Sequence, residues 1–239
     1  MGRAYEVRKA SIQKNGAIKA KLYSNFAKEI YLAAKNGGTD PDTNANLKRL
    51  IDQAKKNQVP SDIIKRAIDK VNSGVDENYT SCRYEGFGPG NSTLIVDCLT
   101  DNVNRTVGFV RSAFTKCSGK LGVENSVSHF YENLALFAVK GYAEEELFEN
   151  LMMNDCDVKD IETDDDVVVI TGDAKEYNNI RKALISINPD IDLQMDEIAM
   201  VPLDKVTLEG EDKELFDKLL SMLDDIEDVQ NVYHNVELW

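Results

Sequence analysis

The residues whose types and spacing suggest chemistry are the lysines and arginines near the start of the chain. Residues 1–75 hold 15 Lys and Arg against 7 Asp and Glu, a net charge of +8, whereas residues 76–239 hold 13 against 35, a net of −22. A cationic region on an otherwise acidic protein is typical of a surface that binds phosphate groups. The candidate nucleic-acid contacts are Arg3, Arg8, Lys9, Lys14, Lys19, Lys21, Lys28, Lys35, Lys48, Arg49, Lys55 and Lys56.

For any single one of these side chains, an ordinary solvated position is the simpler interpretation. The set favours nucleic acid, because only Glu6 and Glu29 accompany eight Lys and Arg within residues 1–36. An acidic scaffold that binds other proteins, with an incidental basic end, stays open as the alternative function. Reversing the charges of lysines in this region would separate the two, since a scaffold should keep its partner.

A second candidate for chemistry is the glycine-rich stretch Gly86–Gly90, which could be taken for a nucleotide-binding loop. Such a loop needs a strand, then the glycines, then a helix N-terminus aimed at the phosphate. Here the glycines lead into Thr93–Leu99, an apolar segment that predicts a buried strand. The stretch therefore predicts a turn between two strands.

Residues suited to catalysis or metal binding are few and scattered. The four cysteines, each in an apolar pattern that predicts a buried free thiol, are Cys82, Cys98, Cys117 and Cys156. His129 and His234 lie in strand-like segments without a second ligand close by in the sequence. Asp164–Asp166 lacks the alternating ligands of a calcium loop and predicts a solvated hairpin. We expect no metal, no cofactor, no small-molecule substrate and no enzymatic activity.

Three short amphipathic helices are expected to carry the basic residues. One face of the first helix carries the recurring apolar residues Ile18, Leu22, Phe26 and Ile30, and Gly37-Gly38 ends the helix. The second helix covers residues 47–56, and Pro60 opens the third. The lysines of the first helix are expected to lie largely away from its apolar face. Residues 1–17 hold few large apolar side chains, so we expect them to order only on binding.

Two α/β units are expected after the polar segment Gly74–Asn78. The first has two strands joined by the glycine turn, then a helix capped by Asp101 or Asn104. Ser126–Tyr131 is predicted as a further strand. The second unit has the β-α-β-β-α-β order of a ferredoxin-like fold, and its first helix, Glu144–Asn154, is expected to turn Leu147, Phe148, Leu151 and Met152 inward.

The C-terminal helix and strand, Glu211–Asp225 and Val229–Leu238, have no partner of their own and should return to complete the first unit. The predicted fold class is α+β with three domains: an N-terminal three-helix domain and two α/β domains of ferredoxin-like type, the middle one discontinuous. The predicted boundaries are 1–75 for the basic helical domain, 79–131 plus 207–239 for the discontinuous α/β domain, and 132–206 for the inserted domain.

Several motifs are similar to signatures of the YebC/PmpR family. They are Arg83–Gly90, Leu99–Thr106, Asp228–Val236, Asn44–Ala54 and Val59–Ala67. The resemblance implies the three-domain fold and a regulator of gene expression, because the family includes bacterial proteins described as transcriptional regulators and a mitochondrial translational activator of cytochrome oxidase. The start, Gly2-Arg3-Ala4-Tyr5-Glu6, departs from the Gly-His-Ser-Lys-Trp stretch of many members and is nearer to YeeN-type proteins.

The expected partner is nucleic acid, either DNA or the ribosomal RNA of the ribosome. A body of net charge −22 is repelled by a duplex that approaches side-on, whereas the basic end alone can enter a cleft walled by RNA. The charge distribution thus favours the ribosome. No apolar run approaches the roughly 20 residues that a membrane span requires, and no secretory segment is evident. We therefore predict a cytoplasmic protein without a membrane partner.

Overall fold

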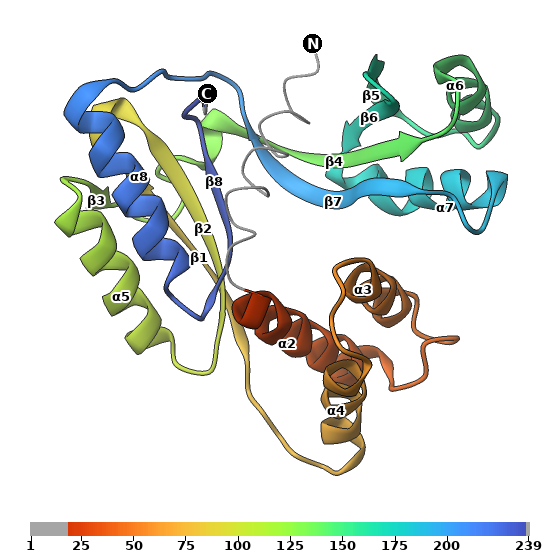
Figure 1. Ribbon diagram of the computed structural model, residues 1–239, viewed down its shortest axis with the longest axis horizontal. Helices are drawn as coiled ribbons and strands as arrows, with labels where there is room; N and C mark the ends of the chain where they lie inside the picture. Colours follow the sequence, from red (N-terminus) through yellow and green to blue (C-terminus); the bar gives the residue numbers. More distant parts are fainter. Residues whose placement is uncertain (1–18, 238–239) are drawn as a thin grey trace.

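The computed structural model describes residues 19–237 and shows an α+β protein. Three helices come first, α2 (Lys19–Gly37), α3 (Ala45–Lys56) and α4 (Ser61–Asn72). Two four-stranded antiparallel sheets with their own helices follow, and Figure 1 shows the three helices lying below both sheets. Residues 1–18, which include Arg3, Arg8, Lys9 and Lys14, lie outside the described part of the chain.

The helical region has its own small core. Apolar side chains from all three helices meet there, namely Ile30, Tyr31, Ala34, Leu47, Leu50, Ala54, Ile64 and Ala67. Asn44 caps α3, because its side-chain oxygen accepts a hydrogen bond from the backbone N–H of Leu47 at 3.0 Å. The Tyr31 hydroxyl donates to the carbonyl of Val75 and accepts from the N–H of Glu77, both at 2.8 Å. Tyr31 thereby fixes the segment that leads into the first sheet.

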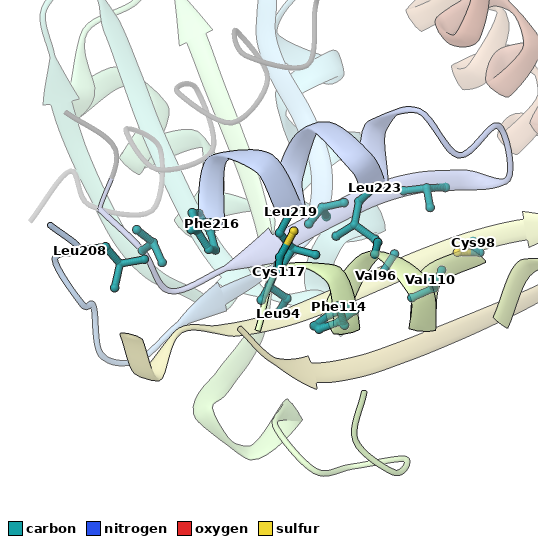
Figure 2. Close-up of a cluster of buried hydrophobic side chains, with 14 residues drawn as sticks. Leu94, Val96, Cys98, Val110, Phe114, Cys117, Leu208, Phe216, Leu219 and Leu223 are labelled. Atoms are coloured by element: carbon teal, nitrogen blue, oxygen red, sulfur yellow. The ribbon is translucent and has the colours of Figure 1, made fainter. Parts of the chain in front are cut away.

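The first sheet has the strand order β3-β1-β2-β8. Its strands are β1 (Thr80–Phe87), β2 (Thr93–Thr100), β3 (Lys120–Leu121) and β8 (Val229–His234). The helices α5 (Val103–Lys116) and α8 (Gly210–Asp224) cover one face, and Figure 2 shows Val110, Phe114, Leu219 and Leu223 in the core between helices and sheet. The expected return of the C-terminal helix and strand is confirmed, since β8 pairs with β2. The domain boundaries stay a prediction.

The glycine-rich stretch is the turn between β1 and β2, as predicted. A short 3-10 helix, η1 (Pro89–Asn91), forms its centre, and Gly90 has a φ of +62°, which favours glycine. Gly86 is required for a different reason. A Cβ atom on Gly86 would lie 2.5 Å from the Phe114 ring and 2.9 Å from the backbone oxygen of Lys120. The stretch therefore packs the sheet edge against α5.

Replacing Gly86 by alanine is expected to destabilise the protein by about 1–3 kcal/mol, because the new methyl group overpacks the core against Phe114. The matched control is Gly108→Ala on α5, where a Cβ would meet nothing within 4 Å. That change should be neutral or stabilise by up to about 1 kcal/mol, since alanine favours the helix over glycine. Urea denaturation of both variants measures the difference, and equal stabilities would contradict the packing role of Gly86.

The second sheet has the strand order β5-β6-β4-β7. Its strands are β4 (Tyr131–Lys140), β5 (Val158–Asp164), β6 (Val167–Asp173) and β7 (Leu193–Pro202), and its helices are α6 (Glu144–Met153) and α7 (Tyr177–Ile187). The elements follow the expected β-α-β-β-α-β order, and the β5–β6 hairpin turns at the acidic residues as predicted. One face packs against α6 and α7, and the other contacts the first sheet through Ile95 and Tyr233.

Three local predictions were wrong. Ser126–Tyr131 is not a strand: it holds the short 3-10 helix η2 (Ser128–Phe130), and only Tyr131 begins β4. The cap of α5 is Asn102, whose side chain accepts from the N–H of Arg105 at 3.0 Å. Phe148 and Met152 on α6 are 44% and 56% exposed, because the sheet accommodates only the narrower face of Leu147 and Leu151.

The cysteine prediction is confirmed in large part. All four cysteines are free; Cys98, Cys117 and Cys156 are buried, and Cys82 is half-buried. Burial raises the pKa of the Cys98 thiol well above its usual value, so this thiol is protonated at neutral pH.

Candidate nucleic-acid interface

Five of the predicted basic residues are exposed on the described helical region, and three of them, Lys19, Lys48 and Lys55, have no close contact with the sheet units or with the segment that leads to β1. Lys19 begins α2, and Lys48 and Lys55 lie two turns apart on one face of α3. The nearest carboxylates to the two α3 ammonium groups are Asp42 at 3.9 Å and Asp52 at 4.0 Å. Exposed ion pairs at such distances contribute little stability. These ammonium groups are therefore available to a phosphate.

Lys21 and Lys28 on α2 face the acidic body of the protein. Lys21 Nζ donates to the backbone oxygen of Asp224 at 2.7 Å. Lys28 Nζ lies 3.3 Å from Asp228 Oδ1, and the Lys28 side chain is only 10% exposed. Burial lowers the pKa of Lys21, although the charge of Asp224 acts in the opposite direction. Both lysines hold α2 against the C-terminal part of the first sheet unit.

Asp228 is the centre of this contact. Besides Lys28, its carboxylate accepts hydrogen bonds from Arg105 Nη2 and Thr106 Oγ1, both at 2.8 Å. Burial alone would raise the pKa of Asp228, but the bonds from Arg105 and Thr106 and the charge of Lys28 outweigh it and lower the pKa. The cluster joins α2, α5 and the start of β8. This explains why two of the sequence motifs, Leu99–Thr106 and Asp228–Val236, belong together in space.

Arg49 and Lys56 on α3 face the second sheet unit. Lys56 Nζ donates to the backbone oxygen of Leu193 at 2.8 Å, at the start of β7. The Arg49 guanidinium lies 5.9 Å from the centre of the Tyr177 ring on α7, within range of a cation–π contact. The helical region thus contacts both sheet units, one through α2 and the other through α3.

Lys35 ends the basic series of α2. Its ammonium lies 2.5 Å from Asp76 Oδ1 and 3.2 Å from the backbone oxygen of Glu77, in the segment that leads to β1. The hydrogen bond to Asp76 raises the pKa of Lys35. The predicted residues therefore form no single surface within the described part of the chain. Nucleic-acid contact by any of them stays a prediction.

A cavity of about 790 Å³ lies between α2, α3 and the first sheet. Glu29 and Arg49 line it from the helices, and Arg83, Asp97 and Gln230 line it from the sheet. Arg83 binds Asp97 through two hydrogen bonds of 2.6 and 2.8 Å. Burial raises the pKa of Glu29, and the charge of Arg49 lowers it in part. The walls combine these charged and amide groups with apolar side chains such as Leu32, Leu50 and Leu99.

The side-chain amide of Gln230 is imperfectly accommodated beside this cavity. Its nitrogen and oxygen are both buried, and neither finds a hydrogen-bond partner within residues 19–237. The side-chain oxygen of Asn25, on the facing helix α2, is likewise buried without a hydrogen-bond partner among these residues. Buried polar atoms without a hydrogen-bond partner cost free energy. The contact between α2 and the first sheet unit is therefore weaker than its ion pairs alone suggest.

Sequence reasoning missed two features of this region. Lys65 on α4 is also exposed and was not included among the candidate contacts. The carboxylate of Asp228 is the internal partner of Lys28, and the charge difference between the two parts of the chain was the signal that pointed to such a partner. Within the described residues no cluster of His, Cys, Asp and Glu could hold a metal ion, and no helix is long and apolar enough to cross a membrane.

Comparison with known proteins gives two family matches. Residues 3–74 match the TACO1/YebC protein N-terminal domain, and residues 79–236 match the TACO1/YebC second and third domain. A probable transcriptional regulatory protein of Vibrio parahaemolyticus is 50% identical over 238 residues, which cover 100% of both chains. One from Pseudoalteromonas translucida is 50% identical over 99% of this chain and 100% of its own.

A solved structure supports the same assignment. The crystal structure of a conserved hypothetical protein from Aquifex aeolicus aligns with a TM-score of 0.76 at 32% identity, covering 92% of this chain and 91% of that one. The matches separate no YeeN-type subgroup, so that finer resemblance stays a prediction. The chain belongs to the TACO1/YebC family.

Proposed function

We propose that this protein is a non-enzymatic regulator of gene expression that contacts nucleic acid through the exposed basic residues of its helical region. The observation that carries the proposal is the pair Lys48 and Lys55, which share an exposed face of α3. The adjacent face, with Arg49 and Lys56, contacts the second sheet unit, and Leu47, Leu50 and Ala54 face the helical core. Relatives at about half identity bear the name probable transcriptional regulatory protein, which supports a nucleic-acid partner.

Of the two targets, the charge distribution favours ribosomal RNA over DNA. The sheet units carry most of the net charge of −22 in residues 76–239, so a long duplex meets repulsion on every side except the helical one. A cleft walled by RNA can receive the helical end alone. The name of the relatives favours DNA instead, and the two targets are separable by experiment.

The double variant Lys48→Glu/Lys55→Glu is expected to weaken nucleic-acid binding at least about tenfold. Each lost phosphate contact should also reduce the salt dependence of log K by about 0.7–0.9. The matched control is Lys175→Glu/Lys182→Glu, which changes the net charge equally on exposed positions of the second sheet unit. Fluorescence anisotropy across a salt series measures both effects. Equal loss in the two double variants would contradict a localised α3 surface.

Co-sedimentation with ribosomes, in the presence of an equal mass of random duplex DNA, separates the targets. Binding that survives the DNA and fades with salt is expected for a factor directed to ribosomal RNA. If the duplex DNA instead displaces the protein from the ribosomes, the result would support the transcriptional function. Binding to neither ribosomes nor DNA would overturn the proposal and support the acidic scaffold.

A further inference from the structure

The stretch 102–123 stands out from the acidic part of the chain. It contains Arg105, Arg111, Lys116 and Lys120 and not one Asp or Glu, although residues 76–239 hold 35 acidic residues. The stretch comprises α5, the following turn and β3. A basic strip is thus present on the unit that otherwise repels anions, and the nucleic-acid contact proposed above does not use it.

The fold presents most of these charges to solvent. Val110, Ala113 and Phe114 bury the inner face of α5 against the first sheet, and Figure 2 shows Val110 and Phe114 within that core. Arg111 and Lys116 lie on exposed positions of α5. Arg105 is different, because it already binds Asp101 and Asp228 at 2.8 Å.

Lys120 extends the charged surface beyond the helix. It is exposed at the start of β3, and the turn before it is fixed by the N–H of Gly119, which donates to the backbone oxygen of Phe114 at 2.8 Å. Arg111, Lys116 and Lys120 have no ion-pair partner within residues 19–237. These three charges therefore do not stabilise the fold through ion pairs and are available to an external anion.

An aromatic ring accompanies the charges. Phe109 is 54% exposed in the middle of α5, seven residues before Lys116 and so on the same side of the helix. Arg111 follows two residues after Phe109, about 200° around the helix, and so lies on the other flank of the exposed face of α5. An exposed phenyl ring with cations on both flanks of one exposed helix face is a combination on which an unpaired base can stack while the backbone phosphates bind the cations. A duplex offers no unstacked base to such a ring.

Gly108 lies directly beside this ring. Glycine inside a helix costs about 1 kcal/mol relative to alanine. No φ in the left-handed region and no close contact requires it here, because a Cβ at this position meets nothing within 4 Å. The absent side chain leaves the backbone next to Phe109 open to a closely approaching ligand.

We propose that Phe109, Arg111, Lys116 and Lys120 form a second contact surface for single-stranded nucleic acid. An unpaired base stacks on Phe109, and the flanking phosphates bind the three cations. Figure 1 shows α5 on the outer side of the first sheet, away from α3 and α4. The surface rests on the proposed function for its class of partner, but it is separate from the α3 lysines and can fail independently of them.

The test uses the full chain and a labelled oligonucleotide of mixed sequence in RNA and DNA forms, as a single strand and as a duplex with its complement. Phe109→Ala should weaken binding about tenfold and leave the salt dependence unchanged, because stacking releases no counterions. Arg111→Glu/Lys116→Glu should weaken binding at least about tenfold and reduce the salt slope by about 1.4. Because all three side chains are exposed, unchanged melting temperatures will confirm that the variants are folded. The charge-matched control is Lys175→Glu/Lys182→Glu.

The outcomes separate this surface from the α3 site. Normal binding by both α5 variants, with loss in Lys48→Glu/Lys55→Glu, would overturn the α5 surface and leave the proposed function standing. Loss in the α5 variants with normal binding by the α3 variant would establish the α5 surface and remove the α3 site. An equal loss for duplex and single strand in Phe109→Ala would overturn the stacking role, as would a wild-type protein that binds neither strand but captures an acidic protein through α5.

Discussion

Replacing Asp228 by alanine is expected to lower the free energy of unfolding by about 3–5 kcal/mol. The substitution leaves the buried ammonium of Lys28 without its carboxylate, and it removes the acceptor for Arg105 and Thr106. An uncompensated buried charge is the costly part, because desolvation of Lys28 is no longer offset by a partner. Urea denaturation with linear extrapolation measures the change.

A second readout tests whether Asp228 holds the helical region in place. Hydrogen exchange of the α2 amides should accelerate in Asp228→Ala more than exchange in β4, because α2 loses its ion pair with the first sheet unit. The control is Asp225→Asn, which neutralises an exposed carboxylate three residues away. A loss of stability of less than about 1 kcal/mol in Asp228→Ala would show that the contact does not depend on this cluster. Equal acceleration of hydrogen exchange in α2 and β4 would show the same.

The same cluster shows what sequence periodicity could and could not predict. The apolar repeat of the first helix indicated which side of α2 enters the helical core: Ile30 is buried there and Phe26 packs against it. Leu22 is 37% exposed, which the repeat did not predict, and Ile18 lies outside the described residues. The repeat could not indicate what covers the other side. Lys28 and Asp228 are 200 residues apart in the sequence, and only the tertiary fold brings them together. A lysine expected to lie away from the core face is therefore buried beneath a second surface.

This internal pairing limits the surface that remains for a partner. A net charge of +8 beside one of −22 attracts the helical region to the body before any nucleic acid binds. Lys21, Lys28 and Lys56 bind groups of the body, whereas Lys48 and Lys55 have only exposed ion pairs of 3.9 and 4.0 Å within the helical region. The total charge of a region thus overstates its capacity for phosphate, because part of the charge is neutralised within the molecule.

The sheets were predictable wherever a strong pattern coincided with a local signal. The continuous apolar run of β2 and the glycine turn before it predicted both the strand and the hairpin. The unpartnered C-terminal helix and strand predicted the pairing of β8 with β2. The prediction failed at Ser126–Tyr131, whose alternation of residue types suggested a strand. The cause is Glu85, a residue some 40 positions earlier that binds this backbone directly.

Glu85 gives the second large expected effect. The residue is 4% exposed, and its carboxylate accepts hydrogen bonds from the backbone N–H groups of Asn125 at 3.1 Å, Val127 at 2.7 Å and Ser128 at 2.9 Å. Glu85→Ala should destabilise the protein by about 3 kcal/mol, because it leaves several backbone donors without an acceptor. Glu124→Ala is the control, since Glu124 is exposed in the same loop. Equal losses in the two variants would contradict the role of Glu85.

The pH dependence provides an independent test of the same carboxylate. Burial raises the pKa of Glu85, but the hydrogen bonds from Val127, Ser128 and Asn125 outweigh it and lower the pKa below its usual value. A carboxyl group whose pKa is lower in the folded state contributes stability that is fully present above its unfolded pKa of about 4.3. That contribution is lost as the pH falls through the folded pKa. The stability difference between wild type and Glu85→Gln should therefore be constant from neutral pH to about 5 and shrink below about 4. If the stability difference stays constant below about pH 4 as well, the charge of Glu85 does not hold the loop.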